Sequence, residues 1–135
     1  MNGSPAGVLE TALYHDPADA EAVERFYRET LGLRAVSRWP GGLAFRAGPS
    51  VLLLFDREKL RERSGPIAAH GTTGPGHACL LAEGPADYER RRDELLAAGV
   101  EITHEHEWDG GRRSLYFEDP AGNLLEIAEG DLWPA

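Results

Sequence analysis

Three side chains spread along the chain have the types that together bind one divalent metal ion. Glu10 interrupts an apolar run at residues 8–14, His77 begins a second run at 77–82, and Glu126 lies inside a third at 124–128. An isolated buried carboxylate is costly, so Glu126 either faces solvent or is paired. One imidazole and two carboxylates suit Fe, Mn, Ni, Co or Zn, and three protein ligands leave positions open for substrate. The structural alternative is that Glu126 faces solvent and the other two are ordinary strand starts.

Other polar residues are candidates for acid–base or binding roles. His70 lies in a loop-like stretch, where it could cover the site as a lid or exchange a proton, or simply be solvated. Tyr116 could donate a hydrogen bond to a metal-bound substrate oxygen, or pack in the core. His104 and His106 alternate with acidic residues, which places both on one strand face. Whether they or Arg112 reach the site is left open by the sequence.

The elements that must position these residues occur in the same order twice. The first half predicts a strand, a helix that ends at Gly32, and three short strands, at residues 8–14, 16–31, 33–38, 43–46 and 51–55. The second half predicts the same order with a helix that ends at Gly99, at residues 77–82, 85–98, 100–104, 114–118 and 124–128. Glu10 and His77 are 67 residues apart, as are Gly32 and Gly99, which indicates an internal repeat.

This repeat predicts an α+β fold of two paired βαβββ modules. One such unit is too small to bury a core alone, so the two are expected to form a curved mixed sheet around a cleft, with the helices outside. We expect a single domain over residues 1–135. Module one covers about 7–56, a linker rich in Gly, Pro and Thr covers 57–75 with a helical turn near 57–63, and module two covers about 76–130.

Three segments resemble one known family. GRRSLYFEDPAGNLLEI resembles the closing signature of the vicinal oxygen chelate superfamily, which contains glyoxalases, bleomycin resistance proteins and extradiol dioxygenases. LETALY with ERFYRETLGLR resembles its opening, and GPGHACLLAE the start of its second module. The resemblance implies metal ligands at Glu10, Leu53, His77 and Glu126. Leu53 cannot ligate, and Glu10 stands where histidine or glutamine is more usual, so the four-ligand pattern of glyoxalase I is incomplete.

The resemblance implies a divalent-metal-dependent enzyme that chelates vicinal oxygens of a small-molecule substrate. The reaction would be that of a lyase, an isomerase or a dioxygenase, with Glu126, Tyr116 and His70 as catalytic candidates. The alternative is a non-catalytic binding protein of the bleomycin-resistance type, which sequesters a drug. A purely structural or regulatory module is a third possibility, without a positive feature to support it. By analogy with the family, we expect a homodimer, whose site is completed within one chain or across two.

Net charge, apolar runs and cysteine content limit the partners and the cellular location that we expect. The net charge of -9 disfavours binding to nucleic acid, since the phosphate backbone is also negative. No apolar run is long enough to span a membrane, and no secretion signal is evident. Cys79 is the only cysteine, so no disulfide can form within the chain, which agrees with a cytoplasmic location.

Overall fold

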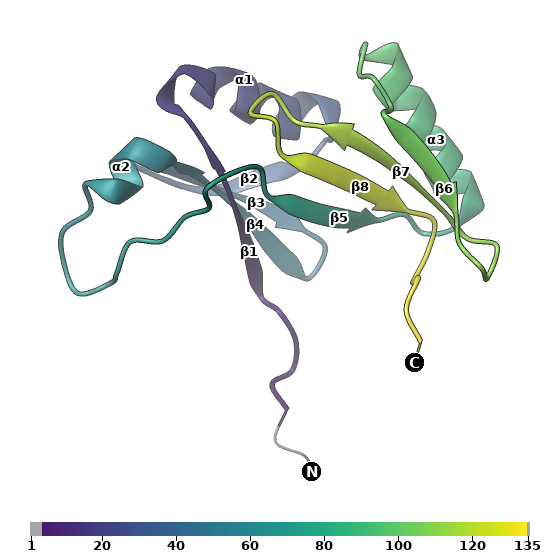
Figure 1. Ribbon diagram of the computed structural model, residues 1–135, viewed down its shortest axis with the longest axis horizontal. Coiled ribbons are helices and arrows are strands. Elements are labelled where there is room, and N and C mark those ends of the chain that lie inside the picture. The colour runs from purple at the N-terminus through teal and green to yellow at the C-terminus, as the bar shows by residue number, and fades with distance from the viewer. Residues whose placement is uncertain (1–3, 135) are drawn as a thin grey trace.

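The protein folds as two four-stranded mixed sheets, one from each half of the sequence (Figure 1). The computed structural model describes residues 4–134. The first sheet has the order β1-β4-β3-β2 and the second β5-β8-β7-β6, so both halves have the same topology. The first-half elements are β1 (Glu10–His15), α1 (Ala20–Arg25), β2 (Arg34–Trp39), β3 (Gly42–Ala47) and β4 (Ser50–Asp56). The others are α2 (Arg57–Arg61), β5 (His77–Leu81), α3 (Pro85–Ala97), β6 (His104–Glu107), β7 (Arg113–Glu118) and β8 (Leu124–Ala128). The predicted α+β fold of two βαβββ modules is confirmed.

The strand register relates the two sheets residue by residue. In the first sheet, β1 pairs with β4 in parallel, and Ala12 lies opposite Leu53. In the second, β5 pairs with β8 in parallel, and Cys79 lies opposite Glu126. Each pair lies two residues beyond the first pair of its ladder, so Leu53 occupies the position in module one that Glu126 occupies in module two. The first sheet therefore has an apolar side chain where the second has a carboxylate.

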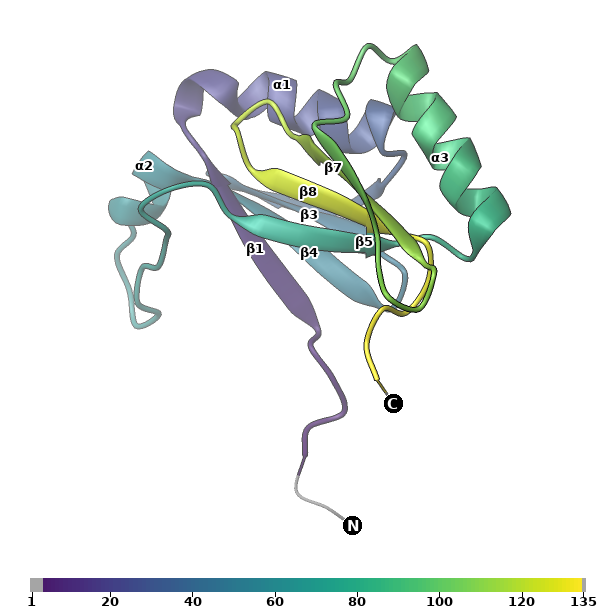
Figure 2. The ribbon, with the colours of Figure 1, turned by 45° about the vertical axis from the view of Figure 1, so that its right-hand side comes forward.

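Each module carries its main helix on one side of its sheet, and both helices lie on the same side of the molecule (Figures 1 and 2). The first helical segment combines a 3₁₀ turn at Pro17–Asp19, α1 and a π-helical turn at Phe26–Thr30. It ends at Gly32, where φ is 71°, and α3 is followed by Gly99 with φ of 79°. These left-handed residues stop both helices as predicted, because glycine adopts such angles without steric cost.

One predicted strand is wrong in position. Residues 100–104 were expected to form a strand from their apolar pattern, but the strand here is β6, His104–Glu107. The amide of Val100 donates to the carbonyl of Leu95 and so closes the end of α3. Val100 and Ile102 then pack against the core from a non-strand segment. Their apolar character reflects burial under the helix, and strand pairing falls instead on the polar residues that follow.

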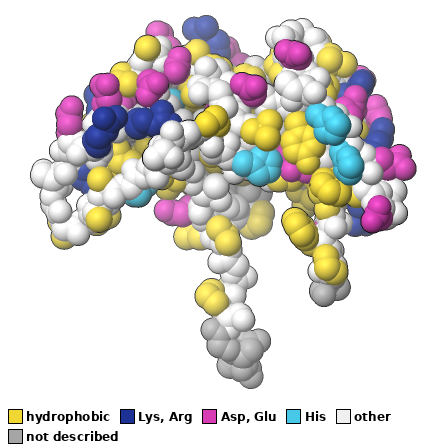
Figure 3. Space-filling view, in the orientation of Figure 1, with side chains coloured by type: hydrophobic (Ala, Val, Ile, Leu, Met, Phe, Trp, Pro, Cys, Tyr) yellow, Lys and Arg dark blue, Asp and Glu magenta, His cyan; other side chains and the backbone are white. Residues whose placement is uncertain are grey.

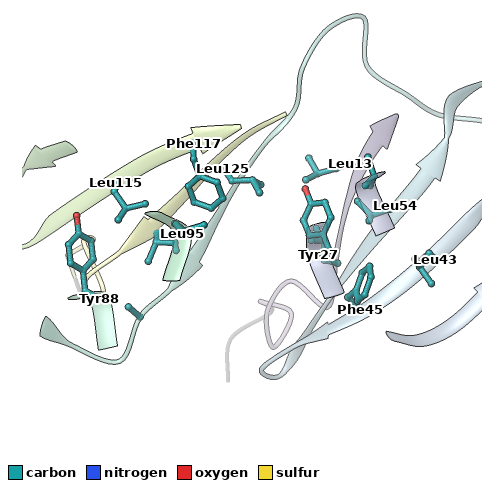
Figure 4. Close-up of a cluster of buried hydrophobic side chains, with 14 residues drawn as sticks. Leu13, Tyr27, Leu43, Phe45, Leu54, Tyr88, Leu95, Leu115, Phe117 and Leu125 are labelled. Atoms are coloured by element: carbon teal, nitrogen blue, oxygen red, sulfur yellow. The ribbon is translucent and has the colours of Figure 1, made fainter. Parts of the chain in front are cut away.

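The two modules share one buried core (Figure 4). Tyr27 and Phe45 come from module one, Phe117 and Leu125 from module two, and all four are fully buried in the same cluster. A second, smaller cluster lies on the other face of the first sheet, where Tyr14 packs with two further apolar residues, Phe55 and Leu60. Burial of aromatic rings at the junction joins the modules by the hydrophobic effect.

A buried polar cluster also joins the modules. The carboxylate of Asp119 accepts hydrogen bonds from the hydroxyl of Tyr27 at 2.7 Å and from the amide Nδ2 of Asn123 at 2.9 Å. The Asn123 side chain also donates to the carbonyl of Tyr14 and accepts from the amide of Gly76. The segment 119–123 connects β7 to β8. The structure shows that its side chains bind module one as well.

Candidate functional site

A polar face lies on the second sheet, on the side away from α3. Side chains alternate along each strand, so one set faces the helix and the other faces out. Leu115, Phe117, Leu125 and Ile127 are the buried, helix-facing set. In the space-filling view, histidine side chains gather over this sheet (Figure 3). We call this surface the open face of the second sheet. Its strand residues include His77 and Cys79 on β5, His104 and His106 on β6, Ser114 and Tyr116 on β7, and Glu126 on β8.

Both nitrogens of the His77 ring face oxygen atoms. Nδ1 lies 2.9 Å from the carbonyl oxygen of Leu124, and Nε2 lies 3.3 Å from Oε1 of Glu126. A carbonyl only accepts, so Nδ1 carries a proton. In neutral imidazole the Nε2 lone pair then faces a carboxylate oxygen, and two acceptors this close repel each other unless a cation neutralises them. A second ring proton or a metal ion satisfies the contact.

The Glu126 carboxylate is buried and oriented by its neighbours. Its side chain is only 8% exposed, whereas that of His77 is 48% exposed. Oε2 accepts a hydrogen bond from the hydroxyl of Ser114 at 2.6 Å, and that hydroxyl accepts one from Nε1 of Trp108 at 3.0 Å. Of the two possibilities for Glu126, exposure or pairing, the structure shows a buried and paired carboxylate.

Two further groups beside Glu126 keep their protons. Burial, and then the negative charge of Glu126, raise the pKa of Tyr116 above its ordinary value. Desolvation of the sulfur and the same carboxylate raise the pKa of Cys79 to about 12. Tyr116 is therefore neutral at pH 7 and able to donate a hydrogen bond, and its ring is stacked on that of His77 with centroids 6.5 Å apart. The Cys79 thiol is a poor nucleophile, since thiolate is the reactive form.

A row of rings continues from Tyr116 across β6. The centroids of Tyr116 and His104 lie 6.0 Å apart, as do those of His104 and His106. The centroids of His106 and Trp108 lie 4.4 Å apart in a T-shaped arrangement. The alternation of the sequence HEHE predicted that both histidines share a face, and the strand geometry agrees with it. Their position beside Tyr116 was decided by the pairing of β6 with β7.

The structure does not bring the remaining predicted residues to His77 and Glu126 within one chain. Glu10 is exposed at the start of β1, in the first sheet. His70 lies over that sheet too, with Nδ1 2.5 Å from the hydroxyl of Tyr14 and its ring 4.9 Å from that of Phe55. Over residues 4–134, no three His, Cys, Asp or Glu side chains gather closely enough to hold a metal ion. The predicted triad of Glu10, His77 and Glu126 is thus divided between the two sheets.

Arg112, whose place relative to the site the sequence left open, and its neighbour Arg113 make structural contacts. Arg113 forms ion pairs with Glu129 and Glu89, and its guanidinium lies 4.4 Å from the centroid of the Tyr88 ring. These carboxylates raise the pKa of Arg113, and the hydrogen bonds from Arg113 lower the pKa of Glu129. Arg112 donates to the carbonyl of Asp131. Both side chains are engaged outside the open face of the second sheet.

Two like modules, each a four-stranded mixed sheet with the same strand order, define a class of α+β proteins built from paired βαβββ units. The model of the glyoxalase/bleomycin resistance protein/dioxygenase superfamily matches residues 17–127. The chain belongs to this superfamily, as its motifs predicted.

The chain is also similar to individual proteins over most of its length. A crystal structure of lactoylglutathione lyase from Agrobacterium tumefaciens is 39% identical, with a TM-score of 0.89 over 96% of this chain and 98% of that one. A glyoxalase-related enzyme from Fulvimarina pelagi is 26% identical, with a TM-score of 0.74 over 96% and 92% of the two chains. Virulence protein STM3117 of Salmonella typhimurium is 31% identical over 83% of this chain and 77% of its own length.

Among the helices in residues 4–134, none has the length and apolar character needed to cross a membrane.

Proposed function

We propose that this protein is a divalent-metal-dependent enzyme that acts on a small substrate with vicinal oxygens. The contact between His77 and Glu126 carries the proposal. The carbonyl of Leu124 fixes the proton on Nδ1 of His77, which leaves Nε2 to bind a metal ion, and Oε1 of Glu126 lies 3.3 Å away. A backbone acceptor on the far nitrogen is the usual support of a metal-bound histidine.

The spacing of these two atoms fits ligands of one ion. With bonds of about 2.0–2.2 Å, two such ligands lie about 3 Å apart at right angles and about 3.4 Å apart in tetrahedral geometry. The observed 3.3 Å falls in this range. An imidazole and a carboxylate suit Zn, Ni, Co, Mn or Fe as the bound ion.

A second copy of the chain would supply the third ligand. The open face of the first sheet carries Glu10, and His70 lies over the same sheet beside Tyr14. If the first sheet of one subunit faces the second sheet of the other, Glu10 of the partner subunit joins His77 and Glu126. His70 of the partner subunit would then border the site as the lid or acid–base group predicted from the sequence. A homodimer of this kind has two equivalent sites, as two-fold symmetry requires.

The protein groups then have distinct tasks in catalysis. A bound divalent ion would act as a Lewis acid toward the substrate oxygens. Tyr116 keeps its proton and can donate a hydrogen bond to an oxygen that gains negative charge. Glu126 could accept a proton from the substrate if its Oε1 were released from the ion, since Ser114 holds only Oε2. We favour proton transfer in a lyase or isomerase reaction over dioxygenation, because the lactoylglutathione lyase is 39% identical over nearly the whole chain.

Metal binding tests the proposal first. Metal-stripped protein is titrated with Zn, Ni, Co and Mn by calorimetry, beside His77→Ala and Glu126→Gln. Glu107→Gln is the control, because it removes an exposed carboxylate on the adjacent edge strand. We expect the two site variants to bind at least about a hundredfold more weakly and the control to match wild type, since even outer partners of a ligand are worth 10–100-fold. Equal affinity in all four proteins would refute the metal site.

Mixed dimers test whether two subunits share the site. Glu10→Ala and His77→Ala chains are co-expressed with different tags, and the heterodimer is purified. In a shared site, one of the two sites in this heterodimer contains both native residues, so it should bind one metal ion where each homodimer binds none. A site within one chain predicts no binding to the heterodimer. Tight binding of a basic glycopeptide without metal would instead favour the drug-sequestering alternative.

A further inference from the structure

Trp108 and Ser114 form a chain of hydrogen bonds that ends on the Glu126 carboxylate. The indole Nε1 of Trp108 lies 3.0 Å from Oγ of Ser114, and Oγ lies 2.6 Å from Oε2 of Glu126. Ser114 has no exposed surface, so water does not compete for its hydroxyl. Trp108 is 40% exposed and reaches over Ser114 from the turn that follows β6.

The direction of this chain follows from its chemistry. An indole N–H only donates, so the Ser114 oxygen must accept from Trp108. The single hydroxyl proton of Ser114 is then free to point at Glu126, and an ionised carboxylate only accepts. Both hydrogen bonds therefore run in one direction, from Trp108 through Ser114 to Glu126. The negative charge of Glu126 strengthens the second of them.

The turn that carries Trp108 fixes the start of this chain. The amide of Trp108 donates to the carbonyl of Arg112, and the amide of Gly111 donates to the carbonyl of Trp108, each at 2.8 Å. The centroid of the His106 ring lies 4.4 Å from that of the indole ring, with the two planes inclined by 68°. The indole is therefore held by backbone and side-chain contacts, so it can hold the serine in turn.

We infer that Trp108 and Ser114 are positioning residues that commit Oε2 of Glu126 to the protein and leave Oε1 alone to face His77. The carboxylate would then bind a cation through one oxygen, and it could not rotate to offer both. This inference rests on the proposed function for the identity of the cation, whereas the hydrogen-bonded chain is present in the protein itself. The sequence did not mark either residue as a metal ligand or as an acid–base group, because an indole and an isolated serine hydroxyl seldom have these roles.

The metal-free protein tests the hydrogen-bonded chain. The sequence has three tryptophans, whose indole N–H signals in ¹H–¹⁵N NMR spectra can be assigned with Trp108→Phe and Trp133→Phe. We expect Glu126→Gln to shift the Trp108 indole signal through Ser114 and to leave that of exposed Trp133 in place. In a Ser114→Ala background, Glu126→Gln should no longer move the Trp108 signal. If Glu126→Gln in the wild-type background leaves the Trp108 indole signal unchanged, the inference is overturned, whether or not the protein binds a metal ion.

Metal affinity tests the positioning role. We expect Ser114→Ala to weaken binding by about 10–100-fold, the usual effect of a lost outer partner. Trp108→Phe should weaken it by about 2–10-fold, as one neutral hydrogen bond is lost. Ser64→Ala, which removes an exposed hydroxyl in the segment after α2, is the control and should have no effect.

The possible failures can be told apart. If wild type binds metal and Ser114→Ala binds it equally well, the positioning role is refuted while the proposed function stands. If wild type binds no metal, the proposed function fails, and the indole signals decide the inference alone. Circular dichroism of Ser114→Ala and Trp108→Phe shows whether each variant is folded before its affinity is compared.

Discussion

The buried bond between Tyr27 and Asp119 offers a sharp test of how the two modules are held together. Tyr27 is fully buried, and its hydroxyl donates to Oδ2 of Asp119 at 2.7 Å. Burial, and then the nearby negative charge of Asp119, raise the pKa of Tyr27 far above its ordinary value, so the phenol is always a donor. Tyr27→Phe removes this single oxygen and retains the ring that packs against Phe45.

The expected cost follows from the type of bond that is lost. A hydrogen bond to a charged group contributes about 1.5–3 kcal/mol, and Asp119 is only 4% exposed, so water cannot readily replace the phenol. Asp119 keeps its bonds from Asn123 and from the amide of Ala121, so the loss should not exceed that range. For a chain of this size, about 2 kcal/mol lowers the melting temperature by roughly 6–10 °C.

Tyr88→Phe is the matched control. The Tyr88 ring is equally buried, in the helix of the second module, but its hydroxyl lies 3.4 Å from the more exposed carboxylate of Glu105. A bond this long should contribute less than about 0.5 kcal/mol. Both variants are unfolded with urea at pH 7, and free energies of unfolding are compared. The reasoning is refuted if Tyr27→Phe costs no more than Tyr88→Phe.

Three further predictions concern packing, pH and metal. Gly76→Ala should lower the free energy of unfolding in urea by about 1–3 kcal/mol, because the new Cβ would lie 2.7 Å from a methyl carbon of Leu13. Gly74→Ala is the control and should be neutral, because no atom lies within 4 Å of its Cβ position. Equal losses in the two variants would contradict this packing. Since Arg113 lowers the pKa of Glu129, their pairing stabilises the fold above the ordinary carboxyl pKa and is lost as the pH falls through the lowered pKa. The deficit of Arg113→Gln should therefore shrink below about pH 4, and a pH-independent deficit would exclude this linkage. A saturating divalent ion at about 100 times its Kd should stabilise wild type by roughly 2.7 kcal/mol in calorimetric melting and leave the metal-site variants unchanged; a rise in all of them would indicate binding elsewhere.

Much of the fold was predictable because its signals are local. Gly32 and Gly99 end helices at positions that need a left-handed backbone, and the apolar runs at β1, β4 and β8 mark strands whichever strands they pair with. The strand at 100–104 was misplaced because burial beneath a helix selects the same apolar residues as a buried strand. Periodicity alone does not separate the two in so short a segment.

The candidate site was predicted in part. His77 and Glu126 were selected by residue type and by family resemblance, and the β5–β8 register brings them into contact. Ser114 and Trp108 were missed as partners of Glu126, since hydroxyl and indole groups at strand and turn positions carry no pattern of their own. The only usable signal was that Ser114 and Tyr116 share a strand face with a buried carboxylate beside them.

The sequence by itself determined the type of fold, the family and the residues able to bind a metal ion, because these depend on residue chemistry and on short-range periodicity. Only the tertiary structure decided which of those residues meet. Strand pairing places His77 beside Glu126, and the division into two sheets leaves Glu10 and His70 on the other one. The physical reason is that contacts between distant residues follow from sheet register and module packing, which depend on the whole chain at once.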